Sequence, residues 1–279
     1  MRSTRMTAIA AGVVIMVAGL SACNDNGGKA EGGGSSSSSG GSDTGGGQQE
    51  PATDAQSALK AAQQATEAKK SAKLDGTTKT GTGTMTTKGG VDWHDGMQMN
   101  LEVTQPGGAG KALKALYTKD AVYMKMGTPM PGGKSWMKTS YESLSQQPGA
   151  GAAIKEMIAT ANPGQPIEWM AAAEGLKVVG KEDVKGVQAT HYSGTVSLEI
   201  QGKHLSPEAQ EAMKKQLEKS KVKSEKLDIW IDSNNLLVKK QEEIGGTQSS
   251  TATVYYSGYG TKVDVTPPPA SQVMERPGA

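Results

Sequence analysis

Two short patterns in the sequence contain residue types that could carry out acyl transfer. Ser57 and Lys60 have the S-x-x-K spacing in which a lysine activates a serine nucleophile, and residues 79–81 read K-T-G. The S-x-x-K spacing recurs at residues 135–138 and 220–223, and no S-D-N lies between Ser57 and the K-T-G. The two patterns are also too close together in the sequence for such an enzyme. We therefore expect no catalytic site of this kind.

The other titratable residues show no spacing typical of catalysis. The sequence has no G-x-S-x-G, H-E-x-x-H or G-x-x-x-x-G-K-[ST] motif. Asp92, His94 and Asp95 could ligate a metal, but the chain has 3 histidines in all, so a solvated hairpin is the better interpretation. Glu242 and Glu243 are adjacent on a predicted strand and point to opposite faces. The sequence therefore predicts no metal, no cofactor and no enzyme.

A leader segment precedes the single cysteine of the chain. Arg2 and Arg5 are followed by a short apolar stretch, residues 6–20, which ends in small residues. This is the layout of a secretory signal peptide, and the stretch is shorter than the roughly 18–20 apolar residues that span a membrane. No second apolar stretch follows it. We expect residues 1–22 to be a signal peptide and the exported chain to have no transmembrane helix.

The cysteine itself, Cys23, ends the sequence L-S-A-C, which resembles the bacterial lipobox. In a lipobox the leader is cleaved before the cysteine, and the thiol receives a diacylglyceryl group that anchors the protein in the membrane. The alternative is an unmodified thiol near an ordinary cleavage site, with no disulfide partner. Residues 23–49 then form a lipidated, Gly/Ser-rich tether that holds the domain roughly 25–30 Å from the membrane on average. We expect a lipid-anchored protein on the extracytoplasmic face of the cell membrane.

The charge balance of the mature chain excludes one class of partner. The chain has 30 Lys+Arg and 28 Asp+Glu, and removal of Arg2 and Arg5 with the leader leaves 28 of each sign. No basic excess is left to attract nucleic acid. We expect one folded domain over residues 50–269, followed by a flexible tail over residues 270–279.

Period-two alternation dominates this domain and predicts its fold class. Helices are expected only at residues 51–70, 151–161, 166–174 and 206–219. Strands are expected at residues 74–87, 97–103, 122–126, 134–139, 176–183, 187–200, 226–231, 236–244 and 250–259. Because short polar turns join consecutive strands, the pairing is antiparallel. The sequence predicts an α+β fold with a large antiparallel sheet and a few helices against one face.

The second half of the domain resembles a known family of envelope lipoproteins. Residues 179–192 contain a V-G-x-E-x-V-x-G-V-x-x-T-H-Y pattern, residues 230–232 read W-I-D, and a V-x-V-x-P-P pattern covers residues 263–268. These patterns are similar to those of the LppX/LprA/LprF/LprG lipoproteins of the actinobacterial envelope. The resemblance covers about residues 51–268 and is most specific in the second half. Within it, His191 is expected to pack and hydrogen-bond beside Tyr192 rather than to act as a base.

The resemblance implies a curved, half-open antiparallel sheet like that of LolA and LolB, with helices covering its concave face over an apolar cavity. Members of this family bind acylated lipids or glycolipids and help to move them across the envelope. An acyl lipid or glycolipid is thus the implied ligand, and an envelope transport protein is a possible partner. The chain departs from the family in having no Phe and only 4% aromatic residues.

Methionine is the residue type that could replace aromatic side chains in the cavity wall. The chain has 14 methionines, several of them in predicted strands, and thioether side chains adapt to ligands of irregular shape. The alternative is that they fill an ordinary closed core. The candidate pocket-lining residues are Met97, Met99, Leu101, Val122, Met124, Met126, Trp136, Val196, Leu198, Ile229 and Ile231.

Two functions from different classes follow. The first is a monomeric lipid carrier whose apolar cavity takes acyl chains out of water. The second is an interaction or sensing module of the envelope, in which the same curved sheet has a closed core. A large apolar void would favour the carrier, whereas a filled core with an exposed apolar patch would favour the module.

Overall fold

The computed structural model describes residues 52–105, 112–145, 156, 158, 162–203, 205–220, 222–245 and 249–276. The signal peptide, Cys23 and the tether lie outside the described residues. So does the helix expected at residues 151–161, except for Glu156 and Ile158, which are both helical.

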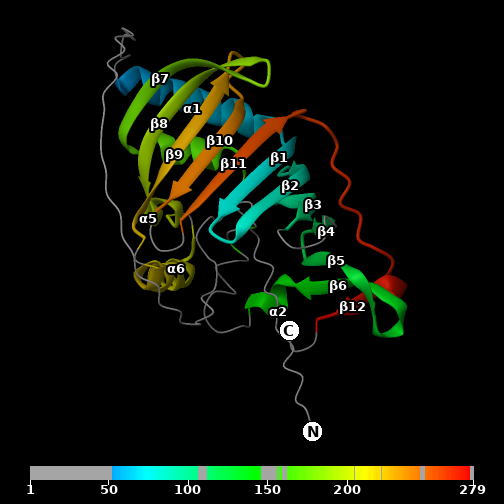
Figure 1. The fold of residues 1–279 in the computed structure, drawn as a ribbon. Coiled ribbons are helices and arrows are strands. Elements are labelled where there is room, and N and C mark those ends of the chain that lie inside the picture. The colour runs from blue at the N-terminus through cyan, green and yellow to red at the C-terminus, as the bar shows by residue number, and fades with distance from the viewer. Residues whose placement is uncertain are drawn as a thin grey trace, which may run out of the picture.

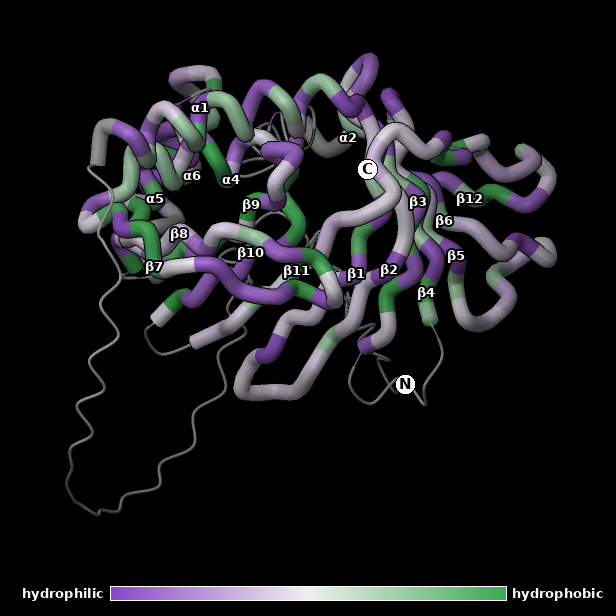
Figure 2. Tube along the Cα trace, turned by 90° about the horizontal axis from the view of Figure 1, so that it is seen from above, coloured by the Kyte–Doolittle hydropathy of each residue, from purple (hydrophilic) through white to green (hydrophobic). Residues whose placement is uncertain are grey.

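A single sheet of twelve strands forms the domain, in the order β12-β6-β5-β4-β3-β2-β1-β11-β10-β9-β8-β7 (Figure 1). Every neighbouring pair is antiparallel except β12 and β6, which are parallel. The strands are β1 (Ser71–Thr80), β2 (Gly83–Asp92), β3 (Gln98–Thr104), β4 (Ala112–Tyr117), β5 (Ala121–Met130), β6 (Lys134–Ser140), β7 (Glu174–Val184), β8 (Val187–Ser197), β9 (Ser224–Asp232), β10 (Leu237–Ile244), β11 (Ser250–Ser257) and β12 (Val273–Glu275). The sheet is curved and unclosed, with β12 and β7 at its edges (Figure 2). The predicted α+β class with a curved half-barrel sheet is confirmed.

Two helices lie on the inside of the curve and cover the sheet, α1 (Ala52–Ala68) and α4 (Gln165–Ala171) (Figure 2). In α1, Ala55, Leu59 and Ala62 recur every three or four residues and are buried, as expected of one face of a helix against a core. The helix ends where Lys70 adopts the left-handed conformation, with φ 64°. The short α2 (Tyr141–Ser145) and α5 (Leu198–Gln201) and the longer α6 (Pro207–Ser220) lie near the ends of the strands (Figure 1).

The main core lies between the concave face and these helices. Strand β3 shows how alternation builds it, because Met99 and Leu101 are buried while Gln98, Asn100 and Glu102 point to the outer face. The core residues contributed by α1, α4 and the strands form one continuous apolar cluster.

The structure adds two strands that the sequence analysis did not predict, β4 and β12, and it changes the extent of two predicted ones. The segment 74–87 is a hairpin, in which β1 ends at Thr80 and β2 begins at Gly83. The strand expected to reach residue 200 ends at Ser197, whose side chain accepts a hydrogen bond from the Glu199 amide (3.3 Å) and begins α5. A serine N-cap satisfies a helix terminus and therefore ends the strand here. Leu198 consequently lies on a helix.

The hairpin of β7 and β8 bends over the outer face of the sheet. Its turn has Lys185 and Gly186 at φ 52° and 87°, and Lys185 Nζ lies 3.1 Å from Asp75 Oδ2 and 3.7 Å from the ring centre of Tyr255. A small second cluster lies on this side of the sheet, made of Val184, Ala189, Trp230 and Val238, with Tyr255 packed against it. The C-terminal half of the sheet is therefore covered on both faces.

A C-terminal strap, residues 258–276, crosses the outer face from β11 to β6 (Figure 1). The Gly260 amide donates to the Ser71 carbonyl (2.9 Å), and the Asn100 side chain donates to the Asp264 carbonyl (2.6 Å). At its far end the strap forms a 3₁₀ turn, Ala270–Gln272, and β12. Residues 270–279 were expected to be a flexible tail, but residues 273–275 form β12, whose backbone pairs with β6 at the sheet edge.

Candidate functional site

Eight of the predicted pocket-lining residues lie together on the concave face. Seven are buried in the main apolar cluster and Met124 is partly buried against it. The eight are Met97, Met99, Leu101, Val122, Met124, Val196, Ile229 and Ile231. They come from the loop before β3 and from β3, β5, β8 and β9, so strands far apart in the sequence contribute to one apolar surface.

The other three predicted residues lie elsewhere. Trp136 pairs with Lys125, whereas the next residue, Met137, pairs with Met124. Because directly paired residues share a face, Trp136 points to the outer face and Met137 has the concave position. Met126 continues the phase of Met124 but is only partly buried and lies outside the apolar cluster. Leu198 is buried in α5 rather than in a strand.

Three charged residues on the concave face escaped the sequence analysis. Glu225, Lys240 and Glu242 are 4%, 2% and 4% exposed, and they form what we term the inner polar cluster. Lys240 Nζ lies 2.5 Å from Glu242 Oε1, and Gln201 Nε2 of α5 donates to Glu225 Oε1 at 2.5 Å. Charged side chains are seldom buried to this extent without a partner, because desolvation disfavours the charged form.

The sequence did contain a signal for Glu225. It continues the alternation of Leu227, Ile229 and Ile231, all of which are buried on the concave face. Period-two reading therefore places its carboxyl inside. For Lys240 and Glu242 the signal is absent, because the run 239–243 reads K-K-Q-E-E and has no apolar residue in either phase.

Burial sets the protonation of the inner polar cluster. Desolvation and the nearby charge of Glu242 raise the pKa of Glu225 to about 8, although Lys240 and Gln201 oppose the shift. Desolvation alone would lower the pKa of Lys240, but the charge of Glu242 outweighs it and raises this pKa. At neutral pH the cluster is therefore a Lys240–Glu242 ion pair beside a protonated Glu225, with no net charge.

Two further polar groups in the same apolar core have no hydrogen-bond partner among the described residues. They are the hydroxyl of Tyr141 and the indole N–H of Trp169. Burial raises the pKa of Tyr141, so its hydroxyl remains a donor. A buried donor without a partner costs about 1–3 kcal/mol, which makes both groups available to a polar ligand.

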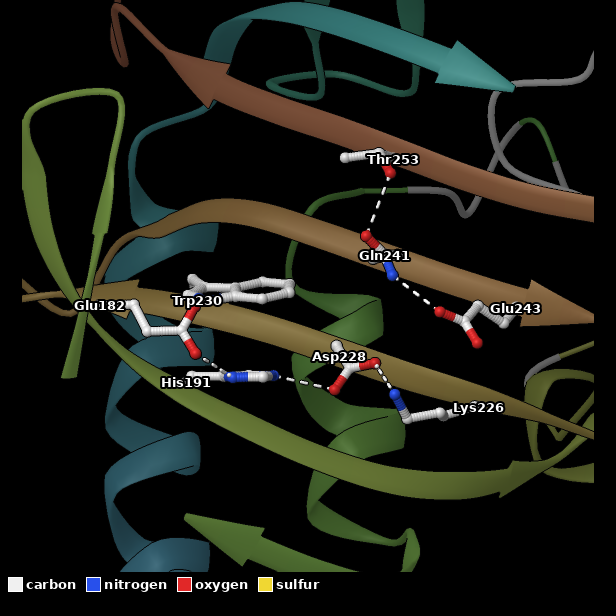
Figure 3. Close-up of polar contacts among 8 residues, drawn as sticks. All are labelled: Glu182, His191, Lys226, Asp228, Trp230, Gln241, Glu243 and Thr253. Carbon is white, nitrogen blue, oxygen red and sulfur yellow. Dashed lines mark hydrogen bonds and ion pairs between the residues drawn. The ribbon is translucent and has the colours of Figure 1, made fainter. Parts of the chain in front are cut away.

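Polar side chains on the outer face form a second network, shown in Figure 3. The ring of His191 lies between two carboxylates, with Nδ1 2.8 Å from Glu182 Oε1 and Nε2 2.8 Å from Asp228 Oδ1. Lys226 Nζ lies 2.9 Å from Asp228 Oδ2. Trp230 donates from its indole to Glu182 Oε2 (2.8 Å) and stacks on His191 with ring centres 4.2 Å apart. We term these five residues the outer polar network.

This network lowers the pKa values of its carboxyls. The indole hydrogen bond from Trp230 holds the pKa of Glu182 below its usual range, with a further contribution from His191. Burial would raise the pKa of Asp228, but hydrogen bonds from His191 and Lys226 lower it well below the usual value. Residues of the V-G-x-E to H-Y and W-I-D patterns thus meet here and hold β7, β8 and β9 together. His191 has the packing and hydrogen-bonding role expected of it.

An open groove also lies on the outer face, beneath the strap. Its volume is about 390 Å³, and its walls include Lys73, Lys88, Lys114 and Lys262 together with Glu102 and Asp264. Val263 of the strap lies against Gly90 so closely that a Cβ there would be 3.0 Å from the valine side chain. Gly90 therefore allows the strap to lie close against the sheet at this crossing.

The residues considered earlier for other chemistry are dispersed. Ser57 and Lys60 are exposed on α1, and Lys79 and Thr80 are exposed at the end of β1. Asp95 is paired with Lys119. Within the described residues, no group of three His, Cys, Asp or Glu side chains could hold a metal ion. In the same part of the chain, no helix is long and apolar enough to cross a membrane.

Comparison with known proteins places the chain among actinobacterial proteins. No protein-family model matches it. A 31.2 kDa protein encoded between rplA and rplJ in Streptomyces griseus is 40% identical over 238 residues, which cover 78% of each chain. A Streptomyces coelicolor protein named "Putative lipoprotein SCO4650" is 30% identical over 234 residues, covering 78% of this chain and 74% of that protein.

The chain belongs to this Streptomyces protein family. Among solved structures, this chain resembles the Mycobacterium tuberculosis lipoprotein LppX. The TM-score is 0.51 and the identity 13%, over 77% of this chain and 99% of LppX. LprF from Mycobacterium bovis matches with a TM-score of 0.49 and 15% identity over 77% and 97% of the two chains. The resemblance to the LppX lipoproteins that the sequence predicted is confirmed at the level of the fold.

Proposed function

We propose that this chain is a membrane-anchored lipoprotein that binds the acyl chains of a lipid or glycolipid on the concave face of its sheet. The observation that carries the proposal is the single apolar cluster on that face of an unclosed, LppX-like sheet. Methionine, leucine and isoleucine side chains from strands of both halves contribute to it. Acyl chains placed there would gain about 25 cal/mol for each Å² removed from water.

The N-terminal residues support the anchoring part of the proposal. A signal peptide at residues 1–22, a diacylglyceryl group on Cys23 and a tether up to residue 49 would place the domain on the extracytoplasmic face of the membrane. The domain would act as a monomer and pass its lipid to an envelope transport protein. Such a carrier needs no catalytic residue and no cofactor.

A second candidate is the envelope interaction module with a closed core. The observation that favours it is the position of the 390 Å³ groove, whose lining residues belong to the outer face rather than to the space beneath α1 and α4. In that case the methionines of the concave face would only fill the core.

Lipid occupancy separates the two candidates. The mature chain carrying Cys23→Ser is purified from a bacterial host without detergent and measured by native mass spectrometry. A carrier retains acyl lipids, and Met124→Trp, which enlarges a partly buried side chain of the concave face, lowers their occupancy. Tyr123→Trp is the matched control, because Tyr123 is the neighbouring residue of β5 on the opposite face. An empty protein that also ignores added lipid would favour the module.

A further inference from the structure

The inner polar cluster is an unusual component of an apolar surface. Glu225 and Lys240 come from neighbouring strands, and register places both, with Glu242, among buried Leu227, Ile229 and Val254. Replacing a buried ion pair by apolar residues of similar size is often neutral or stabilising. Stability alone therefore gives no reason for three ionisable side chains at this place.

These side chains leave hydrogen-bonding capacity unused. The ammonium of Lys240 has three N–H groups, and Glu242 Oε1 accepts one of them. A protonated Glu225 has both a donor and an acceptor, of which Gln201 uses one acceptor site.

The charge balance limits which polar group could bind. Lys240 and Glu242 already pair with each other, with Nζ 2.5 Å from Oε1, so a ligand charge of either sign would meet a like charge without compensation. Anionic phosphate or carboxylate groups face Glu242, and a quaternary ammonium faces Lys240. An uncharged group with several hydroxyls can both donate and accept here at no such cost.

We propose that the inner polar cluster binds the uncharged, hydroxyl-bearing headgroup of an amphiphile whose acyl chain lies on the apolar part of the concave face. This inference rests on the proposed lipid-binding function and names its ligand class. Gln201 of α5 is only partly buried and hydrogen-bonds to Glu225, so we place the entry of the headgroup at α5. In Figure 1, α5 lies at the end of the sheet where β9 begins.

Three probes with one acyl chain test the inference. The lipid-stripped mature Cys23→Ser chain is titrated with monopalmitoylglycerol, which has two free hydroxyls, with methyl palmitate, which has none, and with anionic palmitate. Binding is read from displacement of a fluorescent acyl probe. We expect monopalmitoylglycerol to bind about tenfold more tightly than the other two, as one additional hydrogen bond to a charged group suggests.

Substitutions on β10 provide the matched comparison. The double variant Lys240→Met/Glu242→Leu should lose the headgroup preference while it binds methyl palmitate as before. Lys239→Met/Glu243→Leu changes the adjacent residues, which point to the outer face, and should keep the preference. A folded Lys240→Met/Glu242→Leu variant with an unchanged preference would overturn the inference.

A third variant keeps the test valid if the double variant does not fold. Glu225→Gln resembles the protonated carboxyl in shape and charge. Wild-type affinity for monopalmitoylglycerol should fall as pH rises above about 8, where Glu225 ionises, and in Glu225→Gln it should not. Equal affinity of the wild type for all three probes overturns the headgroup site and leaves acyl binding intact. Failure to bind any of them overturns the proposed function as well.

Discussion

Strand β9 contributes to one polar assembly on each face of the sheet, and two of its carboxyls, Asp228 and Glu225, have pKa values shifted in opposite directions. On the outer face, Asp228 and Glu182 have lowered pKa values because they form hydrogen bonds with His191, Lys226 and Trp230. On the concave face, Glu225 has a raised pKa because it is desolvated and lies near Glu242. Two carboxyls three residues apart on one strand thus have pKa values shifted in opposite directions, because each face of the sheet gives them a different environment.

The largest effect should come from breaking the ion pair of the inner polar cluster. Lys240→Met leaves Glu242 buried without its cation, and we expect a loss of about 3–5 kcal/mol in the free energy of unfolding. The double variant Lys240→Met/Glu242→Leu should recover most of that loss. Urea unfolding of both variants checks this, and a double variant as unstable as the single one would show that the pair itself stabilises the fold.

The second largest effect should be a decrease in the free energy of unfolding as pH rises, caused by Glu225. The pKa of Glu225 is about 8 in the folded protein, against a normal value of 4.5. Its contribution is therefore fully present below about pH 4.5 and is lost as pH rises through 8, with a slope of at most about 1.4 kcal/mol per pH unit. Thermal unfolding between pH 5 and 9 should show this decline in the wild type and a flatter profile in Glu225→Gln. Parallel profiles would contradict the assignment to Glu225.

The outer polar network should show the reverse dependence. Because the pKa of Asp228 is lowered from 3.8 in the folded state, its contribution is present above that value and is lost as pH falls through the folded pKa. Asp228→Asn should cost about 1–3 kcal/mol near neutral pH and should reduce the loss of stability in acid. Chemical unfolding at pH 3 and pH 7 measures both quantities, and an acid profile identical to wild type would exclude Asp228 as its source.

The smallest effect is expected at the tip of the β7–β8 hairpin. Lys185 and Asp75 have side chains that are 55% and 45% exposed, so solvent screens their ion pair. Lys185→Ala should cost less than about 1 kcal/mol, including its contact with Tyr255. Unfolding in low and high salt tests this, and a larger loss would mean that the hairpin depends on its tip for its position over the sheet.

Most of the strands, though not β4 or β12, and the longer helices could be read from the sequence, because alternation and helical periodicity are local. The inner polar cluster could not be predicted from the sequence, and a bulge in β10 is the reason. The register of β9 and β10 shifts between Leu237 and Lys239, which pair with the consecutive residues Ile231 and Trp230. Val238 between them is the extra residue, and it is buried on the outer face while Leu237 is buried on the concave face. This extra residue turns Lys240 and Glu242 inward and Lys239 and Glu243 outward. Nothing in K-K-Q-E-E indicates that choice.

The wrong prediction that Trp136 lines the concave face has a similar cause. The outward direction of Trp136 depends on its pairing with Lys125 and Val273, and the latter lies beyond the predicted end of the domain. An aromatic residue in an alternating strand is normally a core candidate. In β6 the concave position belongs to Met137, which pairs with Met124. The pairing with β5, and not the sequence of β6 alone, shows which residues of β6 face inward.

The parallel pairing of β12 with β6 has a consequence for synthesis of the chain. Strand β1 pairs with β11, and the edge strand β6 obtains its outer neighbour from residues 273–275. Neither pairing can form until β11 and residues 273–275 have left the ribosome, so the strands between them wait for partners that are synthesised much later. Affinity tags fused to the C-terminus of this protein would therefore lie beside a finished sheet edge, and a premature stop codon would remove that edge before any other part of the fold.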